Sequence, residues 1–100
     1  MRAPVPQLRF STRALLDLKR LREFLQPKSP AAAKRATQAI VKSLRVLSQR
    51  PRLGRPIPNL PFGNYEFVIS YGNAGYIARY RFTDGVVTIL SVRHQKEASP

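Results

Sequence analysis

The sequence predicts a two-layer α+β domain in which an N-terminal helical hairpin packs on a mostly antiparallel sheet, in the order β-α-α-β-β-β. Three observations indicate this class. Apolar residues recur with a helical period in the first half, a proline-rich segment follows at 50–63, and three alternating segments joined by turn residues come last. A length of 100 residues fits a single domain, residues 1–100.

A first helix is predicted after a short strand candidate at 7–10, with Ser11 or Thr12 as its N-cap and Pro27 ending it. Asp17 has basic residues three and four positions away, and such surface pairs contribute only about 0.2–0.5 kcal/mol each. The expected apolar face of this helix consists of Ala14, Leu15, Leu18, Leu21, Phe24 and Leu25.

A second helix is predicted to begin with Ser29 as N-cap and Pro30 at its first position, and to end near Arg50. Its short connection to the first helix predicts an antiparallel hairpin, which would cover one face of the sheet. The expected apolar stripe consists of Ala33, Ala36, Ile40, Leu44 and Leu47.

The C-terminal half reads as a three-stranded meander. Strands are expected at 65–71, 76–82 and 86–92, and the Asp84-Gly85 pair is a strong hairpin signal. The segment 50–63, rich in proline, is expected to be an ordered loop.

The middle strand lies within the stretch "GYIARYRF" at 75–82 and carries two arginines on one face. Side chains alternate along a strand, so Arg79 and Arg81 share a face with Ile77. Tyr76 and Tyr80 then belong to the opposite face, under the helices. We expect the tyrosines of the sheet to be packing residues whose hydroxyl groups contact water.

The charge is large and uneven. The chain has 18 Lys and Arg against 5 Asp and Glu, a net charge of +13, of which residues 1–55 carry +12 and residues 56–100 carry +1. This asymmetry favours a polyanionic partner, either a nucleic acid or an acidic protein, over a charge that serves solubility alone.

Composition excludes several classes of protein. There is no cysteine and a single histidine, so disulfides, thiolate metal sites and histidine-rich metal sites are ruled out, and no metal or cofactor is expected. No apolar run is long enough for a signal peptide or a membrane span. We therefore expect a cytoplasmic protein with no membrane partner.

The assembled order of elements resembles the RelE/ParE superfamily of toxins from bacterial type II toxin–antitoxin systems. The resemblance spans roughly residues 8–97 and rests on a combination of motifs: "DL" early in the first helix, "P-x-x-G-R" at 51–55, "Y-R" at 80–81, and "R-H-x-K-E" at 93–97. It implies a cognate antitoxin with an acidic segment that folds over the helices and the sheet edge, and the basic half of the chain suits such a partner.

The superfamily has two branches with different targets. RelE-like members cut messenger RNA in the ribosome, whereas ParE-like members inhibit DNA gyrase without known chemistry of their own. RNA cleavage needs a group that activates the 2′-hydroxyl, cations that stabilise the phosphorane, and a proton donor for the leaving oxygen. RelE-like members place lysines on the first meander strand, an arginine after "G-Y" on the second, and a tyrosine near the C-terminus.

This chain departs from the RelE-like pattern at each of those places. No lysine occurs at 65–71, Ile77 stands where the arginine is expected, and no tyrosine follows Tyr80. We therefore favour a gyrase inhibitor, with a ribosome-dependent endoribonuclease as the alternative and a non-toxic basic nucleic-acid-binding module as a third possibility. The candidate catalytic residues of the endoribonuclease alternative are Arg79, Arg81, Arg93, His94 and Lys96.

The candidate residues for partner binding are all basic, and each also has a plain interpretation. The arginines of the sheet can be solvated residues, Arg55 can pin the proline-rich loop, and the helical cations can serve solubility. The candidates are Arg20, Lys34, Arg35, Lys42, Arg45, Arg55, Arg79, Arg81 and Arg93.

Overall fold

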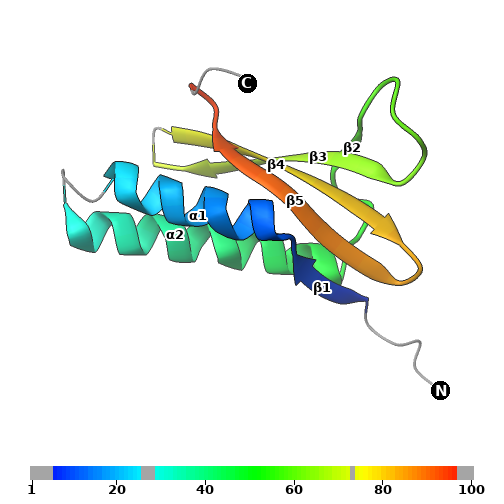
Figure 1. Ribbon diagram of the computed structural model, residues 1–100, viewed down its shortest axis with the longest axis horizontal. Helices are drawn as coiled ribbons and strands as arrows, with labels where there is room; N and C mark the ends of the chain where they lie inside the picture. The colour runs from blue at the N-terminus through cyan, green and yellow to red at the C-terminus, as the bar shows by residue number, and fades with distance from the viewer. Residues whose placement is uncertain (1–5, 26–28, 73, 97–100) are drawn as a thin grey trace.

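The computed structural model describes residues 6–25, 29–72 and 74–96, and its elements form two layers (Figure 1). Two antiparallel helices lie side by side on one face of a twisted five-stranded sheet. The elements are β1 (Gln7–Phe10), α1 (Thr12–Leu25), α2 (Pro30–Arg45), the 3₁₀ turn η1 (Val46–Ser48), β2 (Arg55–Pro56), β3 (Asn64–Tyr71), β4 (Ala74–Thr83) and β5 (Val86–His94). The predicted fold class is confirmed.

The sheet has the order β1-β5-β4-β3-β2. Strands β3, β4 and β5 form the predicted antiparallel meander, and Asp84 and Gly85 turn between the last two with positive φ angles of 53° and 73°. Strand β1 pairs in parallel with β5, so the sheet is mixed with one parallel edge. The short strand β2 was not predicted: it lies inside the expected loop and pairs with β3 through Arg55 and Glu66.

Helix α1 begins at Thr12 because Ser11 caps it. The Ala14 N–H donates to Ser11 Oγ at 3.0 Å, and the same hydroxyl donates to the Leu90 carbonyl at 3.1 Å, which ties the start of the helix to β5. The prediction that Leu15 and Phe24 widen the apolar face was wrong, since they are 55% and 61% exposed. The sheet covers a narrower stripe of this helix than its apolar sequence suggests.

Helix α2 begins as predicted, with Ser29 Oγ accepting the Ala32 N–H at 3.2 Å and Pro30 at the first helical position. It ends at Arg45, earlier than expected, and the chain tightens into η1. Leu47 is nevertheless fully buried, because the 3₁₀ turn keeps it on the inward side. The predicted stripe from Ala33 to Leu47 is therefore confirmed as core.

The core lies between the helices and the inner face of the sheet. Alternation along β4 places Tyr76, Ala78 and Tyr80 in this core, as predicted, and leaves Arg79 and Arg81 exposed on the outer face. A register shift at Arg79 and Tyr80 places one extra β5 residue opposite this point. The fold thus separates an inner face that packs the helices from an outer face that is open to a partner.

Candidate functional site

The outer face of the sheet gathers charged residues from three strands into one row. Arg55 of β2 pairs in register with Glu66 of β3, and Glu66 pairs with Arg79 of β4. Neighbouring strands lie about 4.8 Å apart, so side chains at matching register positions on one face are in reach of each other. The topology therefore brings together two arginines that are 24 positions apart in the sequence and sets an acid between them.

Glu66 forms an ion pair with each of these arginines. Its Oε1 lies 3.4 Å from an Arg55 guanidinium nitrogen, and its Oε2 lies 3.7 Å from Arg79 Nε. The arginine side chains are 79% and 50% exposed, so the pairs are solvated and individually weak. Their main effect is electrostatic, because one carboxylate offsets part of the positive charge at the centre of this face.

Beside this charged row, a second row of outward side chains crosses the three-strand meander, and it is apolar except for an arginine on β5. Val68, Ile77 and Arg93 occupy matching positions on β3, β4 and β5, and Val68 is 53% exposed. Ile77 lies on the outer face beside these residues, as predicted. The position where the RelE-like pattern has an arginine is therefore half-buried on the outer face and is occupied by a hydrocarbon side chain.

The sheet separates the candidate residues for RNA cleavage. Arg79, Arg81 and Arg93 belong to the outer face, whereas His94 lies in register with Tyr76 and its ring packs edge-on against the Tyr76 ring, with centroids 5.2 Å apart. Tyr76 is a core residue. His94 is also engaged through Nδ1, which accepts the Lys96 N–H at 3.0 Å. The histidine and the arginines thus project to opposite sides of the sheet.

The "P-x-x-G-R" loop is attached to the sheet by Tyr80. The Tyr80 hydroxyl donates to the Pro51 carbonyl at 2.8 Å and accepts the Gly54 N–H at 2.9 Å. A Cβ on Gly54 would come within 2.8 Å of both this hydroxyl and the Glu66 carbonyl oxygen, so the close approach requires glycine. This contact places the following residue, Arg55, beside Glu66.

The Tyr80 hydroxyl is therefore a buried structural group, and the expectation of a water-exposed hydroxyl was wrong for this residue. Its side chain is fully buried, and its ring stacks on Tyr65 with centroids 5.2 Å apart. Burial raises the pKa of Tyr80 above the ordinary value of 10.0; the hydrogen bond from Gly54 opposes that rise and Tyr65 adds to it. Burial, and then the neighbouring Tyr71, raise the pKa of Tyr76 in the same way.

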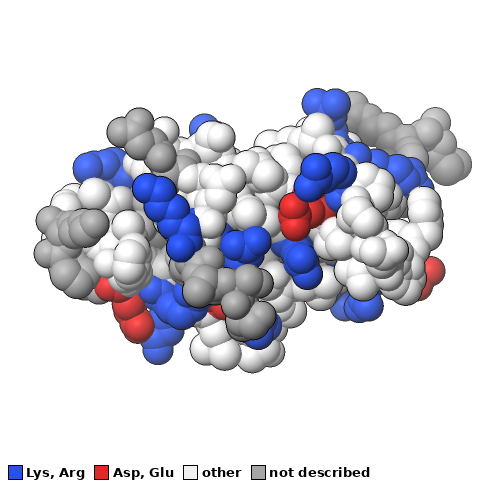
Figure 2. Space-filling view, turned by 90° about the horizontal axis from the view of Figure 1, so that it is seen from above, with Lys and Arg blue, Asp and Glu red and all other residues white. Residues whose placement is uncertain are grey.

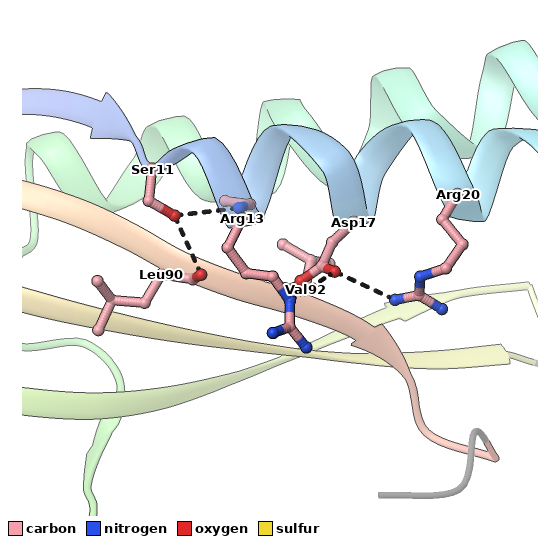
Figure 3. A network of polar contacts seen from close by, with 7 residues as sticks. Ser11, Arg13, Asp17, Arg20, Leu90 and Val92 are labelled. Carbon is pink, nitrogen blue, oxygen red and sulfur yellow. Dashed lines mark hydrogen bonds and ion pairs between the residues drawn. The ribbon is translucent and has the colours of Figure 1, made fainter. Parts of the chain in front are cut away.

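A second acid joins α1 to the sheet (Figure 3). Asp17 is 4% exposed, and its Oδ2 accepts the Val92 N–H of β5 at 2.9 Å. Its Oδ1 lies 3.2 Å from Arg13 Nε and 3.3 Å from an Arg20 guanidinium nitrogen. The predicted partners are confirmed, but their description as surface pairs was wrong, because the carboxylate is buried and bonded to the backbone. Arg20, a candidate for partner binding, therefore has a structural contact.

The remaining candidates lie on the helical layer. Lys34, Arg35, Lys42 and Arg45 are exposed on α2. Figure 2 views the molecule from above Figure 1, on the side of the sheet away from α2, and there Lys and Arg side chains are spread across the surface while Asp and Glu are confined to few places. In the described ranges no group of three or more His, Cys, Asp or Glu residues could hold a metal ion, and no helix there is long and apolar enough to cross a membrane.

Glu66 was not predicted as a member of this site. The signal was available, because Glu66 is the one charged residue on a strand face that otherwise carries Asn64, Val68 and Ser70. Its pairing with Arg55 was not accessible from the sequence, since the loop that carries Arg55 was not expected to contain a strand.

The site and fold together define a small basic α+β protein with an open, partly neutralised sheet face. A family model describing the ParE toxin of the type II toxin–antitoxin system parDE matches residues 8–99. The chain therefore belongs to the ParE toxin family, within the RelE/ParE superfamily that the sequence resembles. The predicted resemblance is confirmed.

Individual relatives carry both RelE and ParDE names. Toxin RelE3 of Caulobacter vibrioides is 35% identical over 85 residues, which are 85% of this chain and 89% of that protein. The chromosomal ParDE system of P. aeruginosa contains a similar chain, with a TM-score of 0.72, 21% identity, and coverage of 90% of this chain and 96% of that one. The RelBE2 toxin–antitoxin complex of Mycobacterium tuberculosis gives a TM-score of 0.65, 29% identity, and coverage of 92% and 100%.

Proposed function

We propose that this chain is the toxin of a type II toxin–antitoxin pair that acts in the cytoplasm by binding and inhibiting a gyrase-class topoisomerase. The observation that carries the proposal is the composition of the outer sheet face. Glu66 pairs with Arg55 and Arg79, and Val68 and Ile77 occupy the adjacent row. This arrangement suits contact with a protein surface better than stabilisation of a phosphorane, which requires unneutralised cations around the reacting phosphate.

Proton transfer is also poorly supported on this face. A general acid or base must lie within about 3 Å of the proton that it moves, or act through one water. His94, a natural candidate, is on the Tyr76 side of the sheet, away from Arg79 and Arg81. The gyrase proposal needs none of these groups to perform chemistry, and it needs no cofactor or metal.

The partner that neutralises the toxin is proposed to be an acidic antitoxin. Both structural relatives belong to toxin–antitoxin systems, one of them a toxin–antitoxin complex. Helix α1 offers exposed apolar residues, Leu15, Leu16 and Phe24, interspersed with basic ones. Such a surface suits an amphipathic segment with acidic and apolar side chains that folds as it binds.

A ribosome-dependent endoribonuclease remains the second candidate. It is favoured by the 35% identity to a toxin of the RelE name and by the three outer-face arginines Arg79, Arg81 and Arg93. In this alternative the outer face would receive RNA, and Glu66 would have to release Arg79 for it to contact a phosphate.

Expression without antitoxin in a bacterial host separates the two candidates. The gyrase proposal expects filamentation, DNA-damage signalling and continued protein synthesis, and it expects the purified chain to inhibit gyrase supercoiling in vitro. Arrest of protein synthesis within minutes, with transcripts cut at ribosomal positions, would establish the endoribonuclease instead. Normal growth with full-length soluble protein would contradict both.

A further inference from the structure

The exposed side of α2 carries four cations on one stripe, which we call the α2 basic face: Lys34, Arg35, Lys42 and Arg45. At about 100° per residue these positions fall within an arc of about 100° around the helix axis. The buried residues Ala33, Ala36, Ile40 and Leu44 lie on the opposite side. The arrangement is a straight, outward-facing row on a helix fixed by its own core contacts.

This row has no internal charge compensation. The sequence contains no Asp or Glu between Glu23 and Glu66, so no acid on α2 can pair with the four cations. Lys42 and Arg45 are three positions apart, a spacing at which like charges repel on a helix. A helix is more stable when acids stand three or four positions from such cations. Because α2 has none, the four cations point to an anionic partner outside the chain.

Within α2 no large apolar side chain is exposed as an anchor for a protein segment, and the nearest is Val46, 44% exposed, at the start of η1. The other exposed residues of α2 are Pro30, Ala31 and Gln38, whereas the exposed side of α1 presents Leu15, Leu16 and Phe24. No aromatic side chain lies on α2, so bases of a single strand have no stacking platform there. A rigid, purely cationic and polar row fits the regularly spaced phosphates of a duplex.

We propose that the α2 basic face binds the phosphate backbone of duplex DNA without reading its sequence. A 16-residue helix is about 24 Å long. The basic row from Lys34 to Arg45 extends over 11 positions of it, about 17 Å, which spans about five base pairs of duplex. Side chains on one helical stripe can therefore reach several phosphates along one groove edge. Contacts of this kind position a protein on DNA, and sequence specificity must come from elsewhere.

The test measures the salt dependence of DNA affinity for the full chain. Binding to a labelled mixed-sequence duplex is followed by fluorescence anisotropy from about 50 to 200 mM salt, a range over which phosphate contacts weaken strongly. The test variant carries Lys34→Gln, Lys42→Gln and Arg45→Gln. The matched control carries Arg9→Gln, Lys19→Gln and Arg22→Gln, which removes the same charge from exposed positions on β1 and α1. Circular dichroism and thermal melting confirm that both variants are folded.

The proposal expects steep salt dependence for the unmodified chain. Each phosphate contact contributes about 0.9 to the slope of log affinity against log salt, so the α2 variant should lose about 2 to 3 units of slope and more than tenfold in affinity. The control should lose less than about 1 unit. Equal losses in the two variants would overturn the proposal, because binding would then depend on total charge alone.

Two further outcomes would also overturn it. One is absence of salt-dependent duplex binding by the unmodified chain. The other is tighter binding of poly-glutamate than of duplex DNA at equal salt, with the larger loss in the α2 variant, because the face would then be a site for an acidic protein. None of these results depends on whether the toxin inhibits gyrase, so the two proposals fail separately.

Discussion

Asp17 and Glu66 each pair with two exposed arginines, and the two acids differ in burial, since the Asp17 side chain is 5% exposed and the Glu66 side chain is 19% exposed. Asp17 is buried between α1 and β5 and accepts a backbone N–H, with arginine contacts at 3.2 and 3.3 Å. Glu66 lies on the outer sheet face, where its arginine contacts are 3.4 and 3.7 Å long. Removal of the Asp17 carboxylate should therefore be costly, because it leaves a buried backbone N–H unpaired, whereas the solvated Glu66 pairs mainly offset positive charge on the outer face.

The largest effect is expected from Asp17→Ala. This change leaves the buried Val92 N–H without a partner and places Arg13 and Arg20 beside each other without a counter-charge. We expect the free energy of unfolding to fall by about 3 kcal/mol, measured by urea denaturation. Asp17→Asn is the matched control, since its amide oxygen can still accept the Val92 N–H. An equal loss in both variants would mean that the ion pairs, and not the backbone bond, carry the effect.

Tyr80→Phe should have the next largest effect, because Tyr80 fixes the loop that brings Arg55 to Glu66. Removal of the hydroxyl leaves the Pro51 carbonyl and the Gly54 N–H unpaired and should destabilise the protein by about 1–3 kcal/mol. Tyr65→Phe, at the stacked neighbour, is the control for loss of a hydroxyl elsewhere in the core. Similar denaturation midpoints for Tyr80→Phe and the unmodified chain would contradict the assigned role.

The pH dependence tests the same hydroxyl. The folded protein binds the Tyr80 and Tyr76 protons more tightly than the unfolded chain does, since both pKa values are raised above 10.0. This contribution to stability is complete below about pH 10 and is lost as the pH rises through the folded-state pKa values. We expect the thermal midpoint to fall above pH 10, and to fall less steeply in Tyr80→Phe. Parallel curves for the two proteins would show that Tyr80 does not contribute to the decline.

Glu66→Gln should have little effect on the free energy of unfolding and a larger effect on anion binding by the outer face of the sheet. Its two ion pairs are solvated, so we expect a change below about 1 kcal/mol in the free energy of unfolding. The released arginines should raise the affinity of the outer face for anions, measured as phosphate or heparin binding. Gln38→Glu on α2 provides a contrasting variant, since it adds an acid to the α2 basic face and should weaken DNA affinity. A loss of several kcal/mol in Glu66→Gln would contradict the comparison with Asp17.

The smallest effect is expected from Arg81→Gln. Arg81 is exposed on β4, and within the described residues it has no ion-pair partner. Its replacement should change the free energy of unfolding by less than about 0.5 kcal/mol. Any loss of toxicity in this variant with stability unchanged would then identify Arg81 as a contact to the target. A stability loss comparable to that of Tyr80→Phe would disprove this assignment.

The fold class, the meander and the inward-facing residues of β4 could all be predicted from the sequence. These features follow from local rules: periodicity separates helix from strand, alternation assigns the faces of Tyr80 and Arg79, and the Asp84-Gly85 pair sets a turn. The sequence also showed that Ile77 departs from the RelE-like pattern. Ile77 directly follows the Gly75-Tyr76 pair, and that pair marks the position where the pattern has an arginine.

Tertiary structure alone decided the roles of Asp17, Glu66 and Tyr80. Their partners Val92, Arg55 and Gly54 are 75, 11 and 26 positions away in the chain, and these contacts depend on how layers and strands pack. The exposure of Leu15 and Phe24 has the same origin, since an apolar residue on a helix is buried only where another element covers it. Local patterns specify what each element can bury, and packing decides which of those surfaces remain open to a partner.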